Sequence, residues 1–321
     1  MEKSRLKLGL TEKAKEIASC LELAILLESE AHKPGNVSLV TDFESTHYEH
    51  FLASAVAVSS PLEKAAQTGF AFSERKIEAN QIGIGCVIKE CVENINAWQH
   101  GGNTLLGTVI LLSPMATAAG MTLANSDFDI PFFRKNLKII IDSTTSEDAV
   151  NLYSAIETAK PGGLGKAPDL DVADPSSKQK ILDGGITLLE VFKIARKYDS
   201  ICSEWTDNYP ITFDVAYPSL RQELKKQADP TEAVIQTFLA VLSQVPDTFI
   251  ARKVGSQKAS AVSLKAKRIV EAGGVETIEG KQMLKKFDRE LRKSGNLLNP
   301  GTTADIVAAG LTICILEGYR P

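Results

Sequence analysis

Residues 105–123, which read LLGTVILLSPMATAAGMTL, decide the fold class of this 321-residue chain. Leucine, valine, isoleucine, alanine and glycine make up most of the stretch, and it contains no charged residue. A helix that is apolar on nearly every side must be covered by other helices or by a partner. The stretch therefore predicts a buried central helix, and it would suit a subunit interface of a homo-oligomer equally well.

The segments around this stretch also place apolar residues at helical spacing. They are residues 11–27, 48–68, 77–98, 147–159, 178–198, 217–227, 231–242, 262–272, 278–294 and 304–316. Only residues 137–141 and 211–215 could pass for strands, and both are short. No fixed-period repeat and no Ser/Gly-rich linker divides the chain. We predict an all-α fold, a single large multi-helix domain spanning residues 1–321.

The bulk composition narrows the classes of protein. The chain is 44% hydrophobic, and its 36 basic and 40 acidic residues are spread along it with a net charge of -4, which disfavours a nucleic-acid partner. The five cysteines form no Cys-x-x-Cys pair, and the charged N-terminal residues lack a secretory apolar core. The apolar run 109–124 is broken by Pro114 and falls short of the roughly 20 residues of a membrane span. We expect a cytoplasmic protein without a membrane partner.

Several loops between the predicted helices are richer in glycine and polar residues than a connector needs. Glycine lets a backbone approach a ligand, and Asn or Thr before a helix leaves N–H groups free for an anion. A phosphorylated ligand would use such parts. The loops are Lys33-Pro34-Gly35-Asn36, Gly101-Gly102-Asn103-Thr104, residues 161–166, Pro246-Asp247-Thr248, Arg252-Lys253 and residues 299–305.

Each loop taken alone has a structural explanation. Asn103 and Thr104 could simply cap the central helix. Residues 161–166 lack the spacing of a P-loop and could be a flexible connector. Asp305 could be an acid that complements a helix dipole. His47 and His50, three residues apart, could share a metal ion, but a solvent-facing helix start explains them as well.

The order of the loops resembles the triphosphoribosyl-dephospho-coenzyme A synthase family. The stations that carry the resemblance run from residue 28 to residue 305 and cover most of the chain. They are Glu28 with Lys33-Pro34-Gly35, Asn103-Thr104 with Gly107, Asp247-Thr248 with Arg252, Phe287-Asp288-Arg289-Glu290, and Pro300-Gly301 with Ala304-Asp305. The branch from archaea and methylotrophic bacteria is the most similar, through residues 34–37, 147–149, 161–165, 171–172, 246–248 and 251–253.

The chain also departs from the family pattern. Leu105 and Leu106 stand where the synthases have His-Lys after Asn-Thr and the archaeal-type branch has Asn-Leu. Phe249 stands where the synthases have Asn and that branch has His. Val254 replaces a usual Gly or His, and Ser45 falls near an expected aspartate. Either the ligand differs from the family's, or activity has been lost.

The resemblance implies an all-helical transferase that moves the 5-triphosphoribosyl group of ATP to the 2′-hydroxyl of 3′-dephospho-CoA, or a related coenzyme precursor, and releases adenine. Because a glycosidic bond breaks, a carboxylate is the natural group to accept the hydroxyl proton or to stabilise the cation. Glu28, Asp247 and Asp305 are the catalytic candidates, and Asp247→Asn is expected to abolish turnover with the fold intact.

The same resemblance implies a site for the triphosphate. About four negative charges call for Mg²⁺ on carboxylates, for cations and for backbone N–H groups. Glu28 and Asp247 are the metal candidates. The nucleotide-binding and phosphate-binding candidates are Lys33, Asn103, Thr104, Gly163, Gly165, Arg252 and Lys253. Two alternatives stay open: a catalytically silent nucleotide-binding protein, and a purely structural helical scaffold.

Overall fold

The computed structural model describes residues 9–124, 127–226 and 229–321, which form fifteen α-helices and no strand. The all-α prediction is confirmed. The helices are α1 (Leu10–Glu30), α2 (Tyr48–Ser73), α3 (Ile84–Trp98), α4 (Leu106–Leu123), α5 (Ile130–Asp142), α6 (Ser146–Ala159), α7 (Ser177–Gly184), α8 (Leu188–Ala195), α9 (Ser200–Thr206), α10 (Tyr217–Lys225), α11 (Pro230–Gln244), α12 (Thr248–Val254), α13 (Ser256–Glu271), α14 (Ile278–Arg292) and α15 (Gly301–Leu316).

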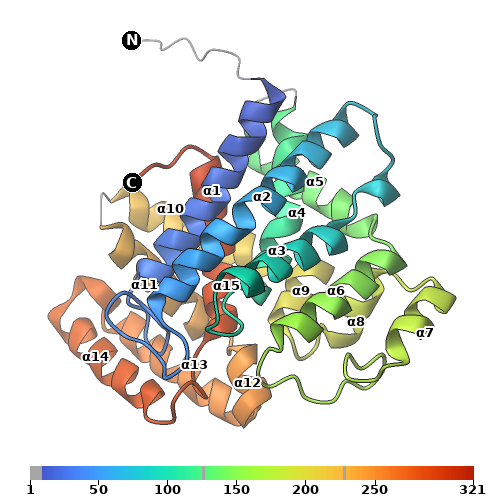
Figure 1. The fold of residues 1–321 in the computed structure, drawn as a ribbon. Coiled ribbons are helices and arrows are strands. Elements are labelled where there is room, and N and C mark those ends of the chain that lie inside the picture. The colour runs from blue at the N-terminus through green and yellow to red at the C-terminus, as the bar shows by residue number, and fades with distance from the viewer. Residues whose placement is uncertain (1–8, 125–126, 227–228) are drawn as a thin grey trace, which may run out of the picture.

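Helix α4 is the core helix that its sequence predicts. It packs against α1, α2, α3, α5 and α15, and Figure 1 shows it behind α2 and α3. The backbones of α2 and α4 touch, because a Cβ on Gly69 or on Gly120 would lie 2.1 Å from a carbonyl oxygen of the other helix. Its length and composition would suit a membrane span, yet 89% of that window is buried inside the protein, as expected of a core helix.

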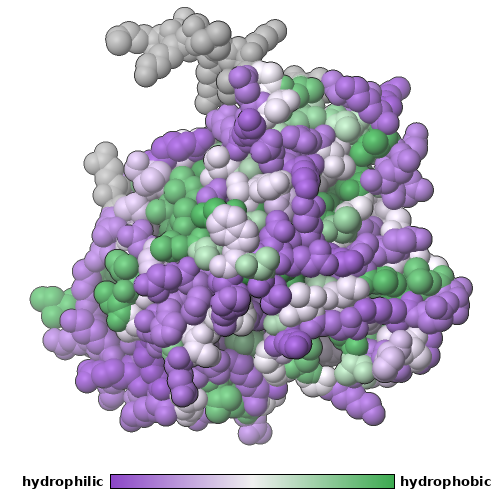
Figure 2. Space-filling model, viewed as in Figure 1, coloured by the Kyte–Doolittle hydropathy of each residue, from purple (hydrophilic) through white to green (hydrophobic). Residues whose placement is uncertain are grey.

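Side chains on the outside of the bundle are mostly hydrophilic. On the face in Figure 2, apolar patches are separated by hydrophilic side chains. Helix α15 is a second helix that is buried nearly all round, and it packs against both α1 and α4. Two neighbouring core helices of this kind leave the amphipathic helices to cover them.

Both short segments that could pass for strands are helical. Residues 137–141 lie in α5, where Phe133, Leu137 and Ile140 share one buried face at helical spacing. A five-residue window is too short to distinguish this spacing from a buried strand. Residues 211–215 enter a π-helical turn, Thr212–Ala216.

The other boundaries differ mainly at glycine and at caps. The predicted helix 178–198 is two helices, because Gly185 adopts a positive φ of 60° and Thr187 caps α8 through Glu190 N–H. The predicted end at residue 227 lies outside the described residues. The short helices α9 and α12 were not predicted, since one or two turns show too little periodicity.

The loop after α1 is fastened by α14. Asp288 Oδ1 accepts the Gly35 N–H at 2.8 Å and also the Arg292 Nε–H at 2.8 Å, while Arg292 Nη2 donates to the carbonyl of Asn36. Gly35 has a φ of 76°, and a Cβ there would lie 2.9 Å from Leu291. The turn therefore requires glycine, and it holds the end of α1 facing the N-termini of α4 and α15.

Candidate active site

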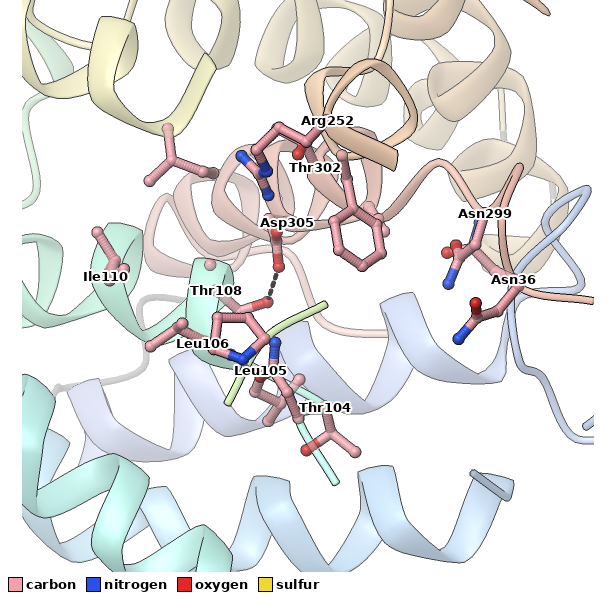
Figure 3. A pocket seen from close by; sticks show the side chains of 18 of the residues that line it. Asn36, Thr104, Leu105, Leu106, Thr108, Ile110, Arg252, Asn299, Thr302 and Asp305 are labelled. Carbon is pink, nitrogen blue, oxygen red and sulfur yellow. Dashed lines mark hydrogen bonds between the residues drawn. The ribbon is translucent and has the colours of Figure 1, made fainter. Parts of the chain in front are cut away.

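A cavity of about 220 Å³ lies where the end of α1 faces the N-terminal ends of α4 and α15, with α9 and α12 at its side. Figure 3 shows Arg252 of α12 pointing toward Asp305 of α15, which meets Thr108 of α4. Two asparagines, Asn36 and Asn299, face this space at its other end. Two helix N-termini, those of α4 and α15, bring partial positive charge to one region, which favours an anionic ligand.

Several buried polar atoms that line the cavity lack a hydrogen-bond partner. Among the described residues, seven buried side-chain nitrogen or oxygen atoms lack a hydrogen-bond partner. Four of them line this cavity: Ser29 Oγ, Arg252 Nε, Asn299 Oδ1, and Glu28 Oε1, which accepts no hydrogen bond but lies 3.1 Å from the Lys33 ammonium. Because a buried polar atom without a partner is costly, such a cluster indicates a place for a polar ligand.

Asp305 has one hydrogen bond and an unusual titration. Thr108 Oγ1 donates to its Oδ1 at 2.6 Å. The pKa of Asp305 is raised to about 8, mainly by burial and also by the charges of Glu28 and Asp247, while Thr108 and Arg252 oppose the rise. Its other oxygen lies against Gly107, where a Cβ would be only 2.1 Å from Oδ2. The carboxyl group is therefore largely protonated at neutral pH and is positioned by a glycine.

Glu28 forms a buried pair with Lys33. Lys33 Nζ lies 3.1 Å from Glu28 Oε1 and donates to the carbonyls of Glu28 and of Ala31, the latter at 3.0 Å. Burial raises the pKa of Glu28 and Lys33 lowers it. Lys33 lines the cavity as predicted, but its three donors already face partners in the protein. The geometry favours Lys33 as the counter-charge of Glu28 over a role as a phosphate clamp.

The Asp247 carboxylate has a structural role, because the protein itself occupies both of its oxygens. Its Oδ1 accepts the N–H groups of Phe249 and Ile250 at the start of α12, and its Oδ2 accepts the N–H and the hydroxyl of Thr303, all within 2.8–3.0 Å. It is 2% exposed and is not among the residues that line the cavity. Asp247 joins α12 to α15. We therefore expect Asp247→Asn to lower the stability of the fold rather than to act on turnover alone.

The Arg252 side chain is paired with Asp199, which the sequence analysis missed. Arg252 Nη1 donates to Asp199 Oδ2, and both residues line the cavity. Asp199 also caps α9 by accepting the N–H groups of Ile201 and Cys202. An aspartate before a short helix carries only a capping signal in the sequence, so nothing local marked its second role.

The predicted phosphate loops divide into two groups. Asn103 and Thr104 line the cavity, although Asn103 Oδ1 also accepts the Leu106 N–H at 3.1 Å, as a helix cap does. Gly163, Gly165 and Lys253 lie outside its lining. Lys253 Nζ donates to Asn296 O at 2.6 Å and sits 3.5 Å from the centre of the Phe249 ring, and burial lowers its pKa to about 8.

Comparison with known proteins adds a family to this geometry. The model of the CitG family, described as ATP:dephospho-CoA triphosphoribosyl transferase, matches residues 14–321. The chain belongs to this family. The predicted resemblance is confirmed, and the chain is a transferase of the triphosphoribosyl-dephospho-CoA synthase type.

Individual relatives are distant. One from Pseudomonas fluorescens (strain Pf0-1), named "Probable 2-(5''-triphosphoribosyl)-3'-dephosphocoenzyme-A synthase", is 22% identical over 267 residues, 83% of this chain and 78% of the relative. One with the same name from Pseudomonas syringae pv. tomato is 27% identical over 109 residues, 34% of this chain and 37% of the relative. A crystal structure from Archaeoglobus fulgidus, provisionally named triphosphoribosyl-dephospho-coA synthase, has a TM-score of 0.62 at 22% identity and covers 85% of this chain and 100% of that one. It shows the shared fold.

Three of the five departures from the family pattern line the cavity of this transferase, and Ser45 and Val254 do not. Leu105 and Leu106 are buried in its wall, and Phe249 borders it below Arg252 and Lys253. Val254 is 36% exposed and lies outside the lining. The cavity of this chain therefore has a more apolar wall than the family motif predicts.

The predicted magnesium ligands do not form a donor set. Within the described ranges, no group of three His, Cys, Asp or Glu side chains could hold a metal, and this includes His47 and His50. Both oxygens of Asp247 already accept two hydrogen bonds, and Glu28 Oε1 faces the Lys33 ammonium. The residues present do not fit a magnesium ion held by Glu28 and Asp247.

Proposed function

We propose that this cavity performs the triphosphoribosyl transfer with Asp305 as general acid and Glu28 as general base. The bond between C1′ of the ATP ribose and N9 of adenine breaks, and Asp305 supplies the proton that adenine needs to leave. The 2′-hydroxyl oxygen of dephospho-CoA bonds to C1′, and Glu28 takes the hydroxyl proton. One proton is given and one is accepted, so the step is balanced.

The titration of Asp305 carries this proposal. A carboxyl group with a pKa of about 8 holds its proton at neutral pH and can donate it in the transition state. Purine leaving groups depart more readily when protonated, so a neutral acid suits this side of the reaction. The single Thr108 hydrogen bond leaves Oδ2 of Asp305 available.

Glu28 suits the opposite task because Lys33 stands beside it. The ammonium 3.1 Å away favours the ionised carboxylate, while Asp305 has no ion-pair partner among the described residues. Burial raises the pKa of both carboxyl groups, and the adjacent Lys33 ammonium opposes that rise at Glu28. An acid and base pair needs surroundings that treat its two carboxyl groups differently, as this ammonium does. The repulsion between the two groups also keeps one of them protonated.

The triphosphate is best held by backbone dipoles and Arg252. The first turns of α4 and α15 line the cavity through Gly107, Thr108 and Thr302. Arg252 keeps its Nε without a partner even while Nη1 binds Asp199. A guanidinium group with a free donor and two helix N-termini together suit the roughly four negative charges of ATP.

Adenine release tests the proposal. The purified protein is incubated with ATP and dephospho-CoA, and adenine and the triphosphoribosylated product are followed by chromatography and mass spectrometry. We expect release only with both substrates present, and a loss of about a hundredfold or more in Glu28→Gln. Glu279→Gln, an exposed glutamate on α14, is the matched control and keeps full activity.

Two results would contradict the proposal in different ways. Full activity in Glu28→Gln with unchanged circular dichroism removes Glu28 as the base. Calorimetric ATP binding without adenine release in the unmodified protein identifies a silent nucleotide-binding protein instead.

A further inference from the structure

A second cavity of about 310 Å³ adjoins the first and shares a wall with it. The shared wall has a polar part, the Arg252–Asp199 pair, and an apolar part that includes Leu152, Leu164 and Phe192. The salt-bridged pair therefore has one cavity on each side. A reaction with two substrates needs two binding regions that meet at the reacting atoms.

The second cavity differs from the first in its chemistry. Its inner wall is apolar, with Val191, Ile194 and Ala195 from α8 and Ile156 from α6. Tyr198, which is 43% exposed, stands in the lining and offers an aromatic face to a ligand. Mostly apolar pockets with a few polar groups are typical sites for uncharged organic groups.

Charge argues against the triphosphate in this cavity. Three aspartates line it, Asp169, Asp171 and Asp199, against two cations, Lys166 and Arg252. Asp171 also holds the surrounding loop in place by accepting the N–H groups of Ala167 and Ala173, both at 2.8 Å. The N-terminal turn of α9 reaches this lining through Cys202, but Asp199 already accepts the Ile201 and Cys202 N–H groups.

We infer that the second cavity binds the uncharged pantetheine arm of dephospho-CoA. This inference rests on the proposed function, which places the ribose of both substrates near Asp305. Dephospho-CoA joins an adenosine diphosphate to an arm that carries two amides and no charge. With the arm in the second cavity and the nucleotide in the first, the diphosphate crosses the wall at Arg252, where the unpartnered Nε can donate to it.

Calorimetry with dephospho-CoA and ADP measures how much the pantetheine arm contributes to binding. ADP shares the nucleotide half of dephospho-CoA and lacks the arm, so the ratio of their affinities reports the arm alone. Ala195→Phe fills the second cavity. We expect it to lower the affinity for dephospho-CoA by about tenfold or more, while the affinities for ADP and ATP change by less than about twofold. Lys193→Phe adds the same ring to an exposed position of α8 outside the cavity and leaves the ratio unchanged.

The result that overturns the inference is an unchanged ratio in a folded Ala195→Phe protein, or a loss of ATP affinity in its place. If circular dichroism shows that this variant does not fold, Tyr198→Ala removes the exposed aromatic ring instead, and the same ratio decides. Absence of adenine release in the unmodified protein contradicts the proposed function and leaves this ratio to be read on its own.

Discussion

Asp247 and Asp305 are two buried carboxyl groups of the same region that do opposite things. Asp247 accepts four hydrogen bonds from α12 and from Thr303, whereas Asp305 accepts one, from Thr108. Burial raises the pKa of both. The difference teaches that burial alone does not make a reactive acid: a carboxylate whose lone pairs are all occupied stabilises the fold, and one with a free oxygen beside a cavity can do chemistry.

The largest effect on activity should come from substituting Asp305, the carboxyl group proposed as the acid. Asp305→Asn keeps the shape and can still accept from Thr108, but it has no proton to donate. We expect kcat for adenine release to fall by about a thousandfold, within the usual contribution of general acid catalysis. The melting temperature should stay the same or rise. A loss smaller than about threefold would remove Asp305 from the mechanism; Asp183→Asn, exposed on α7, controls for the loss of one charge.

Substitution of Asp247, the structural carboxyl group, should lower the stability of the protein. Asp247→Asn places an amide NH₂ against N–H donors of α12 or of Thr303, so at least one hydrogen bond becomes a repulsion. We expect the free energy of unfolding to fall by about 3 kcal/mol, as for a broken cap and buried network. Urea denaturation measures it. If stability is unchanged while turnover is lost, Asp247 is catalytic, as the sequence alone suggested.

Gly107 sharpens the comparison by moving Asp305 without removing it. A Cβ at Gly107 would lie 2.1 Å from Asp305 Oδ2, so Gly107→Ala must displace the carboxyl group. We expect kcat to fall by about thirtyfold with ATP affinity nearly unchanged, since small misplacements of a catalytic group are costly. Gly162→Ala is the matched control, because nothing lies within 4 Å of its Cβ. Equal activity of the two variants would argue against a positioning role for Gly107.

The last prediction concerns the pH dependence of stability. The pKa of Asp305 is about 8 in the folded protein and close to 3.8 when unfolded, so the folded state binds its proton more tightly. Its contribution is most favourable below about pH 4 and is lost progressively as the pH rises to about 8. The stability of Asp305→Asn relative to the unmodified protein should therefore increase over that window and level off above it. A difference that is flat with pH would mean that burial does not perturb this group.

The sequence by itself determined the fold class and the set of candidate residues. Residues 105–123 are apolar on nearly every side and predicted a buried helix. The glycine-rich and charge-rich loops contain many of the polar groups that line the cavity, but not Ser29, Thr108 or Asp199. This worked because helical periodicity and loop composition are local properties of a chain. Residues 137–141 and 211–215 stayed ambiguous between strand and helix, because five residues hold too little local information.

Only the tertiary structure decided which candidate does what. Thr108 and Asp305 are 197 residues apart, and Asp247 and Thr303 are 56 apart, so no local pattern connects them. Lys33 forms an ion pair with Glu28, and Arg252 forms one with Asp199. Asp247 accepts hydrogen bonds from both α12 and α15. Whether a polar side chain is free to act depends on how many of its hydrogen bonds the fold has already taken, and that number is set by packing between distant segments.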